Sequence, residues 1–81
     1  MKMFCISDNI DTAVGLKMAG IEYEIITEKE KILSKIEEIL KNKEIGILGV
    51  TEKIYELAED EFKKIEHNNN IPLIVKIPNS N

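Results

Sequence analysis

The residues of this sequence that could best do chemistry follow a short apolar run near its start. Ser7, Asp8 and Asn9 come directly after this run, and a helical pattern begins at Ile10. A hydroxyl, a carboxylate and an amide at a strand-to-helix corner could hold a phosphate, a nucleotide or a metal ion. The same residue types are also common helix caps. The corner therefore has a chemical interpretation and a structural one.

A phospho-acceptor pocket like that of a response-regulator receiver is one chemical interpretation. Lys76-Ile77-Pro78 is similar to the Lys-Pro that follows the last strand of a receiver. The acceptor aspartate of a receiver ends the third strand, however, and this chain has Val50-Thr51 at that place. Phosphorylation needs that carboxylate as the nucleophile. A phosphorelay domain, either receiver-like or like a sugar-phosphotransferase IIB domain, is therefore only the alternative function.

Other chemical sites are also disfavoured. The corner has no glycine to wrap a pyrophosphate, and Asp8 and Asp11 would repel an anion. Cys5 could suggest the phosphocysteine of a sugar-phosphotransferase IIB domain, but that nucleophile ends its strand and Cys5 lies within one. His67 has no second metal ligand at a suitable spacing. We expect no catalytic residue, no cofactor and no metal site, and we interpret Asp8 or Ser7 as a helix N-cap.

Composition limits the possible partners and the compartment. The chain has 81 residues and a net charge of −4, from 15 acidic and 11 basic residues, and every basic residue is lysine. An acidic chain without arginine lacks the positive surface that nucleic-acid binding needs. One cysteine allows no internal disulfide, which favours a reducing, cytoplasmic setting. No apolar run reaches the length of a membrane span. We expect a single α/β domain over residues 1–81 that binds no nucleic acid and does not insert into a membrane.

Four apolar runs alternate with three helical patterns. The runs, interpreted as strands, are residues 3–6, 22–26, 45–50 and 72–77. The first helix is expected over residues 10–19 and ends at Gly20. The second begins at Thr27, with Glu30 completing a capping box. The third begins at Thr51, and residues 67–70 form the loop after it.

This order predicts a doubly wound, Rossmann-like domain with a four-stranded parallel sheet in the order 2-1-3-4 and three helices. The first helix lies alone on one face, so the third and fourth strands lack a covering helix there. In the last strand Leu73, Val75 and Ile77 point one way, and Ile74 and Lys76 point the other. We expect the first of these sets to face the third helix and the second to be partly open. A missing C-terminal helix, a neighbouring molecule in a crystal or a partner protein could cover the open side.

The carboxyl ends of the strands form the edge where ligands and partners of such a sheet gather. We expect partner contacts from the residues that follow the first, third and fourth strands, or that lie close to those ends: Ser7, Asp8, Asn9, Thr51, Glu52, Lys76 and Pro78.

Three stretches of the chain carry a family resemblance. They are ISDNIDTAVGLKMAGI at residues 6–21, IGILGVTE at residues 45–52 and PLIVKIP at residues 72–78. In this order and spacing they resemble the F subunit of the V-type and A-type rotary ATPases. Leu16 stands where an aromatic residue is common in that family. Family members also usually continue past the Ile-Pro with a C-terminal helix, so we expect a truncated chain here.

The resemblance implies a noncatalytic component of the central rotor stalk. Such a protein binds the coiled-coil D subunit of the stalk and, through it, acts with the catalytic A and B subunits. It helps to couple ATP hydrolysis or synthesis to the transport of hydrogen or other ions, while other subunits handle ATP. The implied location is cytoplasmic and peripheral to the membrane, in the soluble ATPase sector.

Overall fold

Four parallel strands and four helical segments alternate along the chain. A computed structural model describes residues 2–68 and 71–78. The elements are β1 (Lys2–Ser7), α1 (Ile10–Met18), β2 (Glu22–Ile25), α2 (Lys29–Lys41), β3 (Ile45–Thr51), α3 (Glu52–Leu57), α4 (Glu59–Asn68) and β4 (Leu73–Ile77). The strands form one parallel sheet in the order β2-β1-β3-β4. The predicted α/β class and strand order are confirmed.

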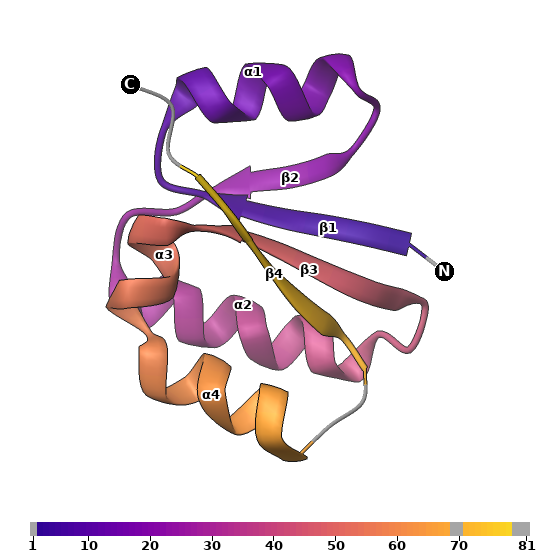
Figure 1. The fold of residues 1–81 in the computed structure, drawn as a ribbon, viewed down its shortest axis with the longest axis vertical. Coiled ribbons are helices and arrows are strands. Elements are labelled where there is room, and N and C mark those ends of the chain that lie inside the picture. Colours follow the sequence, from indigo (N-terminus) through magenta and orange to yellow (C-terminus); the bar gives the residue numbers. More distant parts are fainter. Residues whose placement is uncertain (1, 69–70, 79–81) are drawn as a thin grey trace.

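The helices divide unequally between the two faces of the sheet. Figure 1 shows α1 on one side and α2, α3 and α4 on the other. The helix α1 packs on β1 and β2. Among the described residues, no helix packs on the α1 side of β3 and β4 as α1 packs on β1 and β2, as the sequence predicts.

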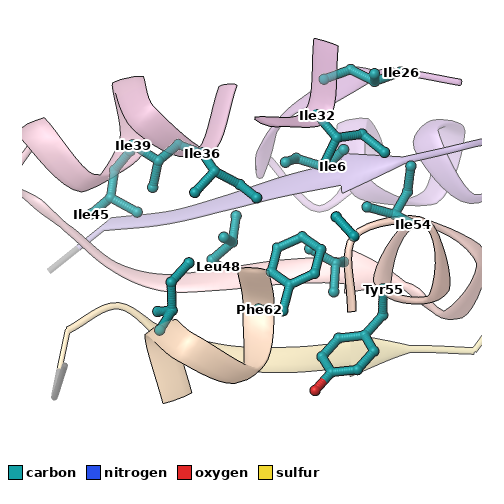
Figure 2. Close-up of a cluster of buried hydrophobic side chains, with 13 residues drawn as sticks. Ile6, Ile26, Ile32, Ile36, Ile39, Ile45, Leu48, Ile54, Tyr55 and Phe62 are labelled. Carbon is teal, nitrogen blue, oxygen red and sulfur yellow. The ribbon is translucent and has the colours of Figure 1, made fainter. Parts of the chain in front are cut away.

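The core lies between the sheet and the three helices on its other side (Figure 2). Helix α2 contributes Ile32, Ile36 and Ile39, whose spacing of four and three residues places them on one helical face. Beneath α3 and α4 the rings of Tyr55 and Phe62 stack, with 5.4 Å between their centroids and an interplanar angle of 14°. These contacts pack the helices against one face of the sheet.

The orientation of β4 is opposite to the prediction. Ile74 packs against the core cluster below α3 and α4. The ammonium group of Lys76 lies 4.1 Å from the centroid of the Tyr55 ring, on the same side. A lysine can face a helical layer in this way because its stem packs on apolar surface while its charge rests over an aromatic face. Leu73, Val75 and Ile77 therefore point to the other side of the sheet, the side that carries α1, where α1 does not cover β4.

The predicted third helix is interrupted at Ala58. Its backbone leaves helical geometry there, with φ −134° and ψ 40°, and α4 begins at the next residue. Three acids, Glu59, Asp60 and Glu61, fill the first turn of α4. Acidic side chains stabilise the positive end of a helix dipole. This acidic run is a sequence signal for a new helix start, which the apolar pattern alone does not show.

Two smaller predictions about helix ends are wrong. Glu28, and not Thr27, occupies the N-cap of α2, and no side chain there makes a capping hydrogen bond. Glu28 instead pairs with Lys31, with 3.5 Å between the charged atoms. The predicted loop after the third helix also starts later, because α4 continues through Asn68. Residues 69–70 and 79–81 lie outside the described part of the chain.

Candidate functional site

The polar corner after β1 is closed by hydrogen bonds within the chain. The Ser7 hydroxyl donates to the carbonyl oxygen of Asn9 over 2.8 Å and accepts the Asn9 N–H over 3.1 Å. The side-chain oxygen of Asn9 accepts the N–H of Thr12 over 2.8 Å, so Asn9 is the N-cap of α1. The predicted cap, Asp8 or Ser7, is one or two residues too early. An Asx residue at the N-cap needs extended backbone, which Asn9 has.

Asp8 instead joins the corner to the end of β3. The buried hydroxyl of Thr51 donates to Oδ1 of Asp8 over 2.6 Å. Thr51 is the residue at which a receiver would place its acceptor aspartate, and here its hydroxyl is a donor to a carboxylate. The structure therefore uses the chemically promising side chains of the corner to hold β1, α1 and β3 together.

The predicted contact residues differ in their accessibility. Ser7 and Thr51 are fully buried, and Asp8 and Asn9 are half-buried. The remaining three, Glu52, Lys76 and Pro78, are exposed. Lys76 lies over Tyr55 on the other side of the sheet, apart from the rest of the group.

Cys5 lies within β1, fully buried on the α1 side of the sheet. Burial raises the pKa of its thiol, and a hydrogen bond involving the Gly49 backbone offsets part of this rise. A raised pKa disfavours the thiolate, which is the nucleophilic form of cysteine. Cys5 therefore has the properties of a small apolar core residue.

We expect Cys5 to react with a thiol reagent only when the chain unfolds. At neutral pH the folded chain should leave the thiol unmodified over the time in which a urea-unfolded sample reacts completely, because the thiol is both inaccessible and protonated. Mass spectrometry of the labelled chain gives the modified fraction. Rapid and complete labelling of the folded chain would show that Cys5 is accessible.

No metal centre is seen among the described residues. Within residues 2–68 and 71–78, no group of three or more His, Cys, Asp and Glu side chains could hold a metal ion. His67 is exposed in the last turn of α4, where a basic residue suits the helix dipole. Among the helices in those same ranges, none has the length and apolar character needed to cross a membrane.

A cluster that the sequence did not reveal ties β4 to α3 and α4. Tyr55, beneath the Lys76 ammonium group, donates its hydroxyl hydrogen to Oε1 of Glu66 over 2.7 Å. This hydrogen bond, together with burial, raises the pKa of Tyr55 to about 12. The three residues come from three different elements, so no spacing in the sequence could have found the cluster.

The raised pKa of Tyr55 predicts a loss of stability at high pH. In the unfolded chain Tyr55 should release its phenolic proton near pH 10, which is below the pKa in the folded chain. The stabilisation of the folded chain by the protonated phenol is therefore fully present below about pH 10 and is lost as the pH rises toward 12. In a Tyr23→Phe background, the tyrosinate absorbance reports Tyr55 alone. Glu66→Gln should move this titration to lower pH, with folding followed by circular dichroism in the same samples. Identical titrations with and without Glu66→Gln would contradict the assignment.

The residues of β1, β3 and β4 that point to the α1 side are uncharged and mostly apolar, and the exposed ones among them are Leu73 and Val75 on β4. Strand register pairs Met3 with Ile47 and Ile47 with Leu73, and alternation brings every second residue of each strand to the same side. We call this set the open face. It consists of Met3, Cys5, Ser7, Ile47, Gly49, Thr51, Leu73, Val75 and Ile77.

Gly49 lies at the centre of the open face, where neighbouring side chains pack closely over its backbone. A Cβ atom at this position would lie 2.8 Å from Sγ of Cys5, 2.9 Å from Cδ1 of Ile77 and 3.1 Å from Cε of Met3. These distances are shorter than ordinary carbon contacts. The absence of a side chain at Gly49 thus lets three neighbouring side chains pack over β3.

The sequence of the chain matches a known protein family over nearly its whole length. The family described as ATP synthase (F/14-kDa) subunit matches residues 3–81, nearly the whole chain. The chain belongs to this family. It is thus a relative of the F subunit of the V-type and A-type ATP synthases, in agreement with the resemblance of the three sequence stretches.

Curated relatives agree with the family assignment, and a solved structure shares the fold. The F subunit of the A-type ATP synthase of Methanocaldococcus jannaschii is 32% identical over 80 residues. The corresponding proteins of Thermoplasma acidophilum and Thermococcus kodakarensis are 28% and 26% identical. The crystal structure of the V-type ATP synthase F subunit from Archaeoglobus fulgidus has a TM-score of 0.67 at 22% identity, covering 94% of this chain and 95% of that one. This structure shows that the fold is shared.

The curated relatives are longer than this chain. The matches cover 96% of this chain but 74% of the M. jannaschii protein, and 84% of this chain but 65% of the T. acidophilum protein. This chain is therefore shorter than the curated relatives that it matches.

Proposed function

We propose that the chain is a noncatalytic component of the central rotor stalk of a V/A-type ATP synthase. It binds the coiled-coil D subunit and, through it, acts with the catalytic A and B subunits. In this role it helps to couple ATP hydrolysis or synthesis to ion translocation. Its place is peripheral to the membrane on the cytoplasmic side, within the soluble sector of the enzyme.

One observation carries this proposal beyond family membership. The side chains of the corner that could do chemistry, Ser7, Asp8, Asn9 and Thr51, are engaged in hydrogen bonds that hold the fold together. Large apolar side chains, in contrast, are exposed on the α1 side. A rigid body with this distribution suits docking onto another protein better than it suits catalysis.

The half-buried and exposed members of the predicted contact set, apart from Lys76, would border the interface. Asp8 and Asn9 lie at the end of β1, Glu52 follows β3 and Pro78 follows β4. Polar residues at the rim of an apolar surface are the usual arrangement in protein interfaces. Ser7 and Thr51 would support this rim from within, and Lys76 lies on the far side of the sheet.

Reassembly of the ATP synthase with and without the chain tests the proposal. A complex that lacks the chain should still hydrolyse ATP but should translocate fewer ions for each ATP, and adding the chain should restore the ratio. ATP hydrolysis by the chain alone would contradict a noncatalytic role. An equal ratio in the two complexes would contradict a role in coupling.

A further inference from the structure

We propose that the outer edge of β4 pairs antiparallel with the same edge of a second copy of this chain, so that the two sheets join into one. Within residues 2–68 and 71–78, β4 has a neighbouring strand on one side only, which is β3. Alternate backbone N–H and C=O groups of an edge strand point away from its sheet and can pair with another strand. This inference goes beyond the proposed function and does not depend on the D subunit.

The two edges of the sheet differ in the charges that they carry. On the edge strand β2, the carboxylate of Glu22 pairs with the ammonium group of Lys2 over 3.0 Å. Glu24 of the same strand pairs with Lys35 over 2.9 Å. Charged side chains along an edge disfavour pairing with another chain. Strand β2 is therefore protected against a second copy, whereas Lys76 is the single charged residue of β4.

The charge of Lys76 is held away from the outer edge of β4. Its ammonium group lies 4.1 Å from the centroid of the Tyr55 ring, on the side of α3 and α4. The Tyr55 hydroxyl donates to Glu66, which fixes the position of the ring. The favourable contact between an ammonium group and an aromatic face keeps the lysine over the ring. The cluster of Tyr55, Glu66 and Lys76 thus leaves the edge without a protecting charge.

The sequence around β4 has the symmetry that such a pairing requires. In an antiparallel pair related by a twofold axis, the residue on the axis faces its own copy. With Val75 on the axis, Leu73 faces the second copy's Ile77, and Pro72 faces the second copy's Pro78. Proline has no N–H to donate, so the ladder ends at equivalent places in both directions. The two prolines therefore limit the pairing to the whole of β4.

The side chains on both faces of β4 suit this register. Directly opposite residues of an antiparallel pair lie on the same face and contact each other. On the α1 side, Leu73 and Val75 are 61% and 38% exposed, and pairing gives both an apolar neighbour. On the helical side, Lys76 faces the second copy's Ile74. An axis at Lys76 would instead place two ammonium groups opposite each other, which is destabilising.

The pairing stops at two copies. A twofold axis uses the β4 edge of both chains, and the outer edges that remain are the charged β2 strands. An axis perpendicular to the sheet also keeps α2, α3 and α4 of both copies on the same side of the joined sheet, the side that they occupy in one copy (Figure 1). The product is therefore a closed dimer and not a fibre.

Sedimentation equilibrium of the chain alone tests the inference. The mass should rise from 9.2 kDa toward twice that value as the concentration increases. Val75→Lys and Val75→Glu should each raise the dissociation constant at least about tenfold, because like charges then face each other across the axis. An equal mixture of these two variants should dimerise more tightly than either alone, because opposite charges then meet. The matched control is Ile25→Lys on β2, where Ile25 is 41% exposed, and it should leave the constant within about twofold.

Three results would overturn the inference. The first is a monomer at every concentration up to about 1 mM. The second is a dimer that neither substitution of Val75 weakens, and the third is a mixture of folded variants that binds no more tightly than each variant alone. If circular dichroism shows that the variants are unfolded, hydrogen exchange of the unsubstituted chain decides. Alternate amides of β4 should then gain protection as the concentration rises, and gains confined to α1 or β2 would contradict the pairing.

Discussion

Phe62→Ala should remove about 3–5 kcal/mol from the free energy of unfolding. The Phe62 ring is fully buried and stacks on Tyr55, so its truncation leaves a cavity below α4. A domain of this size has a total stability of only about 0.05–0.15 kcal/mol for each residue. The variant should therefore lose a large share of its stability and unfold at a clearly lower urea concentration than the unsubstituted chain. Urea unfolding followed by circular dichroism measures the loss.

The second phenylalanine of the chain is a matched control. Phe4 is half-buried and packs at the border of the core cluster, so Phe4→Ala should cost clearly less than Phe62→Ala. Phe62→Leu keeps most of the buried volume and should cost less than about 1.5 kcal/mol. Equal losses for Phe62→Ala and Phe4→Ala would contradict the account of the core.

Thr51→Val should lower the free energy of unfolding by about 1.5–3 kcal/mol. Valine keeps the shape of threonine but cannot donate the 2.6 Å hydrogen bond to Asp8. The Thr51 hydroxyl makes no capping bond to α3, so the substitution removes only the link between the corner and β3. Urea unfolding of the variant gives the size of this link.

Thr27→Val controls for the change from threonine to valine itself. Thr27 is exposed before α2, where the expected capping box does not form, so its replacement should change stability by less than about 0.5 kcal/mol. If Thr51→Val is as stable as the unsubstituted chain, the corner is not held by this hydrogen bond.

The sheet could be predicted from the sequence because its signals are local. The continuous apolar run that ends at Val50 favours a central strand, and alternation with helical patterns favours parallel pairing. Handedness of the crossovers then places α1 alone on one face. Periodicity and chain topology thus sufficed for the strand order and for the bare side of β3 and β4.

The orientation of β4 and the details of the corner could not be predicted in this way. A count of apolar residues favoured burial of Leu73, Val75 and Ile77, but the structure buries Ile74 beside a lysine that is accommodated by Tyr55. That accommodation depends on an aromatic residue far away in the sequence. The N-cap likewise depended on which of three adjacent polar residues has the backbone geometry to reach Thr12.

We infer that this chain acts by binding through its surface, and calorimetric titration against the D subunit is the test. We expect saturable binding with a stoichiometry of one chain to one partner, and no heat of binding when Mg-ATP replaces the partner. Tight binding of Mg-ATP together with no interaction with the D subunit would contradict it.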